Sequence, residues 1–203
     1  MIRSPGLHPT AIALLLVLVV AACGGSVASG ELQGGVVDPP QPKPSFTLTD
    51  TSGEPYRFAA ETDGKLTLLY FGYLNCPDIC PVHLAQIAEV FDRLPDVARD
   101  AVVVFVSVDP ERDSPEDIRR FLDNFDSRFV GLTGTRAELD EAQRAAGVPP
   151  AVVEGEGDRY TVDHAGWVIA YAPDGQHHAN YPFGTRQSEW ANDLEILAAM
   201  DGS

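Results

Sequence analysis

Two cysteines, Cys76 and Cys80, are the residues best placed to do chemistry in this chain. They follow a nearly continuous apolar run, residues 66–71, and precede an amphipathic helical pattern, so the sequence predicts a strand-to-helix turn. Pro81 suits the first helical position, which would place Cys80 at the N-cap. Backbone N–H groups and the dipole at a helix N-terminus favour negative charge, so we expect a thiol here to ionise below its free pKa of about 8.5.

A thiol pair in such a turn could bind a soft metal ion, cycle with a disulfide, or stay oxidised. Cys76 and Cys80 are separated by three residues, one more than in a thioredoxin-type redox motif, which favours metal binding. A permanent disulfide is possible in geometry, but a link that closes so short a loop stabilises a fold little. Two thiolates with one imidazole would make a three-coordinate site suited to Cu(I), or part of a tetrahedral zinc site.

The third ligand cannot be chosen from residue spacing alone. His83 lies three residues after Cys80 on the predicted helix, and His164 lies on a turn between two strand-like runs. His177 and His178 adjoin a Pro-Asp-Gly turn and are expected to be exposed to solvent. On spacing, His83 and His164 both remain possible ligands.

Two aspartates lie close to the predicted turn. Asp109 follows the apolar run at residues 101–108, and Asp78 lies between the two cysteines. Asp109 could orient a ligand, lower a pKa or contact a partner, although forming a turn before Pro110 is the simpler interpretation. Asp78 has the same alternatives, since it could hydrogen-bond the N–H groups of its own loop.

The elements around the thiols alternate between strand and helix, which predicts an α/β sandwich. Strands are expected at 46–50, 66–71, 101–108, 129–132, 160–163 and 167–172, with a hairpin partner of the last through residue 181. Helices are expected at 81–94, 114–125, 135–146 and 190–200, with a loop at 148–158. Right-handed crossovers bring the carboxyl ends of the central parallel strands to one edge, where ligands gather, so Cys76, Cys80 and Asp109 should face one crevice.

The chain divides into three predicted parts. Residues 1–22 carry Arg3 and then an apolar run shorter than the about 20 residues of a membrane span, which is typical of a secretory signal. Val20-Ala21-Ala22-Cys23-Gly24 resembles a bacterial lipobox, which predicts a lipid on Cys23; ordinary cleavage that leaves a free thiol is the alternative. Residues 23–44 are rich in Gly, Pro and Ser and predict a flexible tether that packs on nothing, and residues 45–203 form the folded domain.

The chain has 203 residues and a formal charge of −16. Nucleic acid and anionic membrane surfaces are therefore unexpected partners. The charge could keep the protein soluble or attract cations and basic protein surfaces. The predicted signal places the domain outside the cytoplasm, where neighbouring thiols tend to oxidise.

Four sequence blocks together resemble the SCO/SenC family, in the family's order and over about residues 45–200. They are Phe71-Gly72-Tyr73 with Cys76-Pro77-Asp78-Ile79-Cys80-Pro81, Ser107-Val108-Asp109-Pro110-Glu111-Arg112-Asp113, Gly131-Leu132-Thr133-Gly134-Thr135, and Tyr160-Thr161-Val162-Asp163-His164. The resemblance implies a thioredoxin-like three-layer sandwich with an inserted hairpin. It also implies copper binding through Cys76, Cys80 and His164, so that the resemblance, and not the spacing, selects His164.

Proteins of this family assist assembly of the copper centre of cytochrome c oxidase. The resemblance therefore implies a copper chaperone, anchored by Cys23 on the extracytoplasmic face of a bacterial membrane, that delivers Cu(I) or Cu(II) to an oxidase subunit or another copper carrier. Asp163 joins Asp109 and Asp78 as a possible outer contact or partner contact. Leu74 departs from the threonine that is common there in the family, so a hydroxyl that could bond within the loop is absent.

The alternative function is enzymatic and does not require His164. Cys76 and Cys80 would then act as a thiol–disulfide reductase that keeps the cysteines of a partner reduced, supplied by an external electron donor. A thiol peroxidase is disfavoured, because such enzymes usually carry a hydroxyl shortly before the reactive cysteine, and Leu74-Asn75 provides none.

Overall fold

The strand that leads into the thiols, β4 (Leu66–Gly72), is buried at every position. It pairs in parallel with β5 (Ala101–Ser107) and antiparallel with β9 (Trp167–Tyr171), and β5 pairs in parallel with β6 (Val130–Thr133). The apolar run at 66–71 is thus covered on both faces, as its composition predicts. These coordinates come from a computed structural model that describes residues 30–155 and 160–201.

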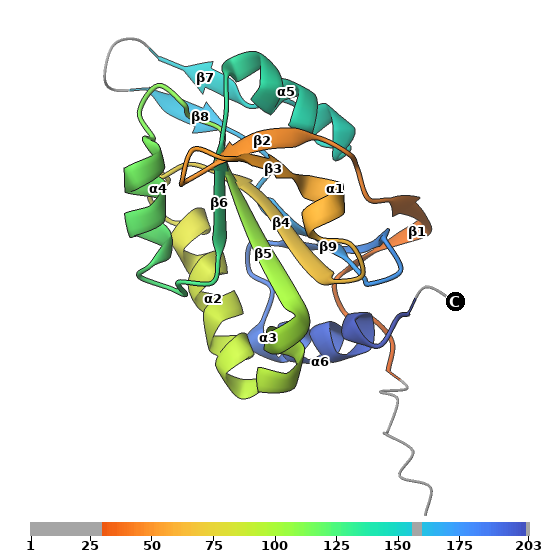
Figure 1. Ribbon diagram of the computed structural model, residues 1–203. Coiled ribbons are helices and arrows are strands. Elements are labelled where there is room, and N and C mark those ends of the chain that lie inside the picture. The colour runs from red at the N-terminus through yellow and green to blue at the C-terminus, as the bar shows by residue number, and fades with distance from the viewer. Residues whose placement is uncertain (1–29, 156–159, 202–203) are drawn as a thin grey trace, which may run out of the picture.

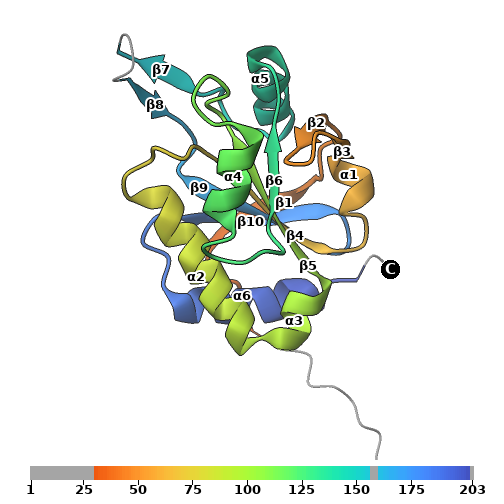
Figure 2. The ribbon, with the colours of Figure 1, turned by 60° about the vertical axis from the view of Figure 1, so that its left-hand side comes forward.

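Eight strands form one sheet in the order β1-β10-β9-β4-β5-β6-β2-β3 (Figure 1). The remaining strands of this sheet are β1 (Gly35–Pro42), β2 (Thr47–Asp50), β3 (Pro55–Arg57) and β10 (Gln176–Pro182). A separate two-stranded sheet is formed by β7 (Val152–Glu154) and β8 (Thr161–Asp163). It stands at the end of the molecule opposite α3 (Pro95–Asp100) and α6 (Gln187–Ala198) (Figures 1 and 2).

In the part of the chain that the structure describes, six helices pack on the sheet and give the predicted three-layer sandwich. They are α1 (Phe58–Glu61), α2 (Ile79–Arg93), α3 (Pro95–Asp100), α4 (Pro115–Leu122), α5 (Arg136–Ala145) and α6 (Gln187–Ala198). On one face, Phe105 of β5 contacts Phe121 of α4 and also Tyr70 of β4. Tyr70 in turn contacts His83 of α2, so α2 and α4 share this face.

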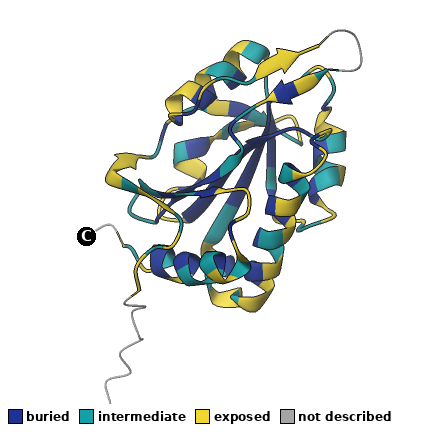
Figure 3. Cartoon of the chain, turned by 180° about the vertical axis from the view of Figure 1, so that it is seen from behind, coloured by how far each residue is buried: buried dark blue, intermediate teal, exposed yellow. Residues whose placement is uncertain are grey.

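The opposite face is covered by α1. Thr67 of β4 pairs with Tyr171 of β9 and points away from the α2 face, because side chains alternate along a strand. The ring of Phe58 in α1 packs edge-on against Tyr171 at a centroid distance of 5.9 Å. Figure 3, seen from behind, shows the central strands mostly dark blue and buried, with exposed residues on the outer elements.

Two helix starts follow directly from their sequences. The Ser114 side chain accepts the N–H of Asp117 at the start of α4, and Thr135 and Glu138 form a reciprocal capping box at the start of α5. In residues 30–155 and 160–201, no helix combines the length and apolarity needed to cross a membrane.

The predicted tether at 23–44 is wrong over its second half. Gly35–Pro42 forms β1, which pairs antiparallel with β10 at the edge of the sheet, with an irregular register between Val36 and Gln41. An edge strand tolerates proline because its outward N–H groups need no partner, which is why a Pro-rich sequence still pairs here. The predicted signal at 1–22 and the lipidation residue Cys23 lie outside the described residues.

Three further boundaries differ from prediction. Helix α2 begins at Ile79 with Asp78 at the N-cap, so Cys80 lies inside the first turn and not at the cap. Pro95 ends α2 but also opens α3 at its first turn, where proline is well tolerated. The predicted loop at 148–158 contains β7, whose pairing with β8 is a tertiary contact without a local signal.

Candidate metal centre

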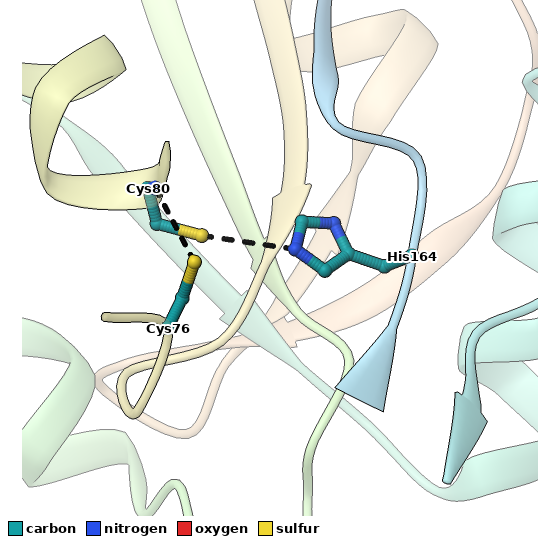
Figure 4. A group of neighbouring side chains, drawn as sticks. All are labelled: Cys76, Cys80 and His164. Carbon is teal, nitrogen blue, oxygen red and sulfur yellow. Dashed lines mark hydrogen bonds between the residues drawn. The ribbon is translucent and has the colours of Figure 1, made fainter. Parts of the chain in front are cut away.

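Two sulfurs and one imidazole meet at the carboxyl end of β4. The ligand atoms of Cys76, Cys80 and His164 all lie within 4.8 Å of one another, and Figure 4 shows the three side chains pointing toward a common point. Sγ of Cys80 is 3.9 Å from Nε2 of His164, although the two residues are 84 positions apart. No other group of three His, Cys, Asp or Glu side chains comes this close in the part of the chain that the structure describes.

The loop between β4 and α2 brings the thiols together. The N–H of Cys76 donates to the carbonyl of Tyr73 at 3.2 Å, and the N–H of Cys80 donates to Sγ of Cys76 at 3.4 Å. Gly72 allows this close approach, since a Cβ there would lie 2.9 Å from Sγ of Cys80 and 2.7 Å from the Phe105 ring. A side chain at position 72 would therefore push Cys80 away from the strand.

The two thiols have opposite acidities. The pKa of Cys76 falls to about 4, chiefly because the Cys80 thiol hydrogen-bonds to it, with further hydrogen bonds from the backbone N–H groups of Asp78 and Cys80. The pKa of Cys80 rises for the matching reason, the hydrogen bond to Cys76, and because this thiol is fully buried. At neutral pH the pair thus holds one thiolate on Cys76 and one thiol on Cys80. The lowered pKa that the helix dipole predicted for Cys80 is therefore wrong, and the lowered pKa belongs to Cys76.

Tyr70 lies beneath this pair. Its hydroxyl donates to Sγ of Cys80 at 3.3 Å. Burial raises the pKa of Tyr70 well above its usual range, so the hydroxyl keeps the proton that it donates. Because Tyr70 lies within the apolar run of β4, the sequence does not indicate that its hydroxyl contacts a cysteine.

His164 presents a defined nitrogen to the sulfurs. Its Nδ1 lies 3.0 Å from the carbonyl of Ala165, so Nδ1 carries the proton and donates, while the lone pair of Nε2 faces the thiols. The ring is half-buried and packs edge-on against Tyr73 at 5.5 Å. An imidazole nitrogen beside two cysteine sulfurs is a donor set suited to a soft cation such as Cu(I).

The group opens to a hollow of about 200 Å³ lined by residues of the cysteine loop and of β8. The lining residues are Tyr73, Cys76, Pro77, Asp78, Ile79, Val162, Asp163, His164 and Gly166. A larger hollow of about 440 Å³ lies at the other end of β4, beside Leu66, and contains neither cysteine nor histidine. The smaller hollow is the chemically relevant one, because two of the three donor residues, Cys76 and His164, line it.

The other histidines lie elsewhere. His83 is fully buried among the rings of Tyr70 and Trp190, where burial lowers its pKa, and it is not part of the group. His177 and His178 are half-buried, so their predicted exposure is wrong: Nε2 of His177 hydrogen-bonds to Asn180 at 2.9 Å, and His178 bonds to Asp174 at 2.8 Å. Their position in the edge strand β10 explains the partial cover.

The carboxylates of the three predicted aspartates make no hydrogen bond to the sulfurs or to His164, although the backbone N–H of Asp78 donates to Cys76. Asp109 is fully buried and accepts hydrogen bonds at 2.5 Å from Nε of Arg112 and from the hydroxyl of Tyr160. Asp78 and Asp163 are exposed and line the hollow. The side chains that the Asp109 carboxylate contacts are thus Arg112 and Tyr160, and not the three donor side chains.

Asp113 is a polar contact that sequence reasoning missed. Its carboxylate accepts the N–H of Leu74 at 3.0 Å and the hydroxyl of Ser107 at 2.6 Å, and burial raises the pKa of this side chain. Asp113 thus fixes the start of the cysteine loop to the end of β5. Asp113 belongs to the block at residues 107–113 that resembles the SCO/SenC family, and this membership could have identified it from the sequence.

A family model described as SCO1/SenC matches residues 37–199. The human mitochondrial protein named SCO1 homolog is 36% identical over 157 residues, which cover 73% of this chain and 50% of that protein. An SCO2-like protein of Rickettsia felis is 34% identical over 134 residues, 65% of each chain. The chain thus spans between half and about two thirds of these relatives.

Solved structures give the same result for the fold. Bradyrhizobium japonicum ScoI, determined with copper bound, superposes with a TM-score of 0.67 at 33% identity and covers 75% of this chain and 97% of that one. Apo Sco1 of Thermus thermophilus superposes with a TM-score of 0.75 at 31% identity, and the match covers 84% of this chain and 99% of that one. The predicted fold class and the predicted resemblance are confirmed, and the chain belongs to the SCO1/SenC family.

Proposed function

We propose that this protein is a copper chaperone that binds one copper ion through Cys76, Cys80 and His164 and helps to assemble the copper centre of cytochrome c oxidase. The observation that carries this proposal is the convergence of two sulfurs and Nε2 within 4.8 Å. Thiolate sulfur retains Cu(I), and the imidazole suits Cu(II) as well. The copper-bound structure of Bradyrhizobium japonicum ScoI supports the choice of metal.

Copper binding at this site is coupled to the release of a proton. Cys76 is already a thiolate at neutral pH, but Cys80 keeps its proton and must lose it to become a ligand. The half-buried imidazole and the adjacent hollow leave one side of the group open. A recipient could therefore insert its own ligands and take the ion by stepwise exchange.

A thiol–disulfide reductase is the second candidate, and the low pKa of Cys76 favours it. The Cys76 thiolate would attack a disulfide of a partner, form a mixed disulfide and release one partner thiolate. Cys80, after losing its proton, would attack the Cys76 sulfur, release the second partner thiolate and leave a Cys76–Cys80 disulfide. The partner gains two electrons, and an external dithiol would regenerate this chain.

A competition titration separates the two functions. The reduced protein is titrated with Cu(I) against a chromophoric chelator, and His164→Ala is compared with His83→Phe, which removes the other nearby imidazole but keeps an aromatic ring. We expect one copper per chain in the unchanged protein. His164→Ala should weaken binding by more than the roughly 10–100-fold typical of an outer contact, and His83→Phe should leave it unchanged.

Two outcomes would contradict the chaperone. One is copper binding that does not depend on His164. The other is no tight binding at all, together with rapid turnover of a model disulfide, which would support the reductase.

We also propose that Cys23 carries a lipid and holds the domain on the extracytoplasmic face of the membrane, on the strength of the Val20-Ala21-Ala22-Cys23-Gly24 sequence. Bacteria that express the full chain would be fed radiolabelled palmitate. The label should enter the protein and be lost in Cys23→Ser. Secretion of unlabelled protein cleaved after Ala22 would contradict the lipid anchor.

A further inference from the structure

The turn that follows β5, residues 108–113, contacts both segments that supply the donor atoms. On the cysteine side, the Asp113 carboxylate holds the N–H of Leu74, two residues before Cys76. On the histidine side, the same turn reaches Tyr160, four residues before His164. These contacts join parts of the chain that are otherwise far apart in sequence.

Arg112 makes the contacts on the histidine side. Its NH1 group donates to the carbonyl of Tyr160 at 3.0 Å, and its guanidinium lies 3.6 Å from the centroid of the Tyr160 ring. The same guanidinium is 5.9 Å from the ring of Tyr73 in the cysteine loop. The Arg112 guanidinium therefore lies close to two aromatic rings: Tyr73 in the cysteine loop and Tyr160 in the segment that leads to His164.

Asp109 fixes the position of Arg112. Its buried carboxylate accepts Nε of Arg112 and the hydroxyl of Tyr160, each at 2.5 Å. A planar guanidinium held by a carboxylate on one edge and an aromatic ring on one face has little freedom to rotate. The arrangement thus determines where Tyr160 lies relative to the end of β5.

His164 lies between a firmly held segment, β9, which begins three residues after it at Trp167, and a weakly held one before it. His164 directly follows β8, which pairs only with β7, over three residue pairs. A two-stranded sheet of this kind is at best marginally stable by itself. The position of the imidazole relative to the sulfurs therefore depends on contacts between this hairpin and the rest of the fold.

We propose that Asp109, Arg112 and Tyr160 form a clamp, the Arg112 clamp, that sets the separation of His164 from Cys76 and Cys80. These are positioning residues, because none of them touches a donor atom. The inference rests on the proposed copper binding, and it assigns to Asp109 a role that acts through Arg112 and Tyr160.

The test is a double-mutant cycle with His164. Cu(I) affinity is measured for Arg112→Gln in the unchanged protein and in the His164→Ala background. We expect about a 10-fold loss in the first case, at the lower end of the range for outer contacts, and no further loss in the second. Arg136→Gln is the matched control, because Arg136 binds the Val108 carbonyl and Glu111 of the same turn but touches neither ligand segment.

Tyr160→Phe provides a milder variant in case Arg112→Gln fails to fold. It keeps the stacked ring and removes only the hydroxyl that donates to Asp109. We expect about a 3-fold loss of Cu(I) affinity, again absent in the His164→Ala background. An equal loss in both backgrounds, or no loss for either variant, would overturn the clamp.

A measurement without metal decides the same point independently. Amide hydrogen exchange of residues 160–166 should become faster in the metal-free Arg112→Gln protein and stay unchanged in Arg136→Gln. If the unchanged protein bound no copper, the proposed function would fail while this measurement still tested the clamp. Unaltered exchange at 160–166 in Arg112→Gln would overturn it.

Discussion

Two polar clusters join distant parts of this chain, and they differ in how many of their polar atoms already have hydrogen-bond partners. One is the Cys76, Cys80 and His164 group. The other surrounds Asp193 of α6, whose carboxylate accepts the N–H groups of Gln33 and Gly34 at 2.8–3.0 Å and the hydroxyl of Tyr181 at 3.0 Å.

The difference shows how a structural cluster can be told from a functional one. The Asp193 oxygens are saturated with donors, which include the Asn192 side-chain amide as well, so this carboxylate has no capacity left for a ligand. In the other cluster, the Nε2 lone pair and the thiolate charge both face an open hollow. Saturated polar groups hold the fold together, whereas groups with spare capacity can bind an ion.

The largest expected effect is on the unsaturated cluster. Cys80→Ser replaces a soft sulfur by a hard oxygen, and we expect Cu(I) affinity to fall about 1,000-fold, which corresponds to about 4 kcal/mol. The free energy of unfolding should change by less than about 2 kcal/mol, because the Tyr70 hydroxyl can still donate to the serine oxygen. Chelator competition and chemical denaturation measure the two quantities. A variant that still binds copper tightly would remove Cys80 from the ligand set.

The saturated cluster should respond in the opposite way. Asp193→Ala leaves two backbone N–H groups and the Tyr181 hydroxyl without their acceptor, so we expect the free energy of unfolding to fall by about 2–3 kcal/mol. Cu(I) affinity of the folded protein should stay unchanged. Asn192→Ala, which removes only one donor, is the control and should cost less than about 1 kcal/mol. Altered copper affinity in Asp193→Ala would contradict the separation of the two clusters.

The acidity of Cys76 gives a pH-dependent test. A thiol whose pKa is lowered to about 4 stays a thiolate until the pH falls through that value. The rate of alkylation of Cys76 by iodoacetamide in the metal-free protein should therefore be nearly constant from pH 8 to about pH 5, whereas an ordinary thiol slows about tenfold per pH unit over this range. Peptide mass mapping assigns the label. A tenfold fall per unit at Cys76 would show that the thiolate is not stabilised.

The smallest effect is expected at the rim of the hollow. Asp78 and Asp163 are exposed, and their carboxylates make no hydrogen bond to Cys76, Cys80 or His164. Asp78→Asn and Asp163→Asn should each change Cu(I) affinity by less than about 2-fold, since exposed charges are strongly screened. A 10-fold loss in either variant would place that carboxylate in contact with the ion.

Much of the fold could be predicted because its signals are local. The continuous apolar runs at 66–71 and 101–108 identified the central parallel strands, and capping residues identified the starts of α4 and α5. β1 and β7 were missed, because their Pro-, Gly- and Glu-containing segments carry no clear strand pattern and pairing with β10 and β8 is what shows that they are strands. Their sequences alone resemble a linker and a loop.

The site was predicted in part. The strand-to-helix turn located both thiols, but spacing left His83 and His164 open, since only tertiary structure decides which imidazole reaches the sulfurs. The hydrogen bond of Tyr70 and the stacking of Arg112 depend on the relative positions of strand, turn and hairpin. No residue pattern within one element encodes such contacts.

The pairing of β1 limits how far the copper site could travel from a membrane. If Cys23 carries a lipid, only about ten residues separate this anchor from Gln33, where the Asp193 contact begins. Ten residues span at most about 35 Å even when fully extended, and a free segment through residue 44 would have spanned about twice as much. A recipient of the metal would then have to present its ligands close to the lipid surface.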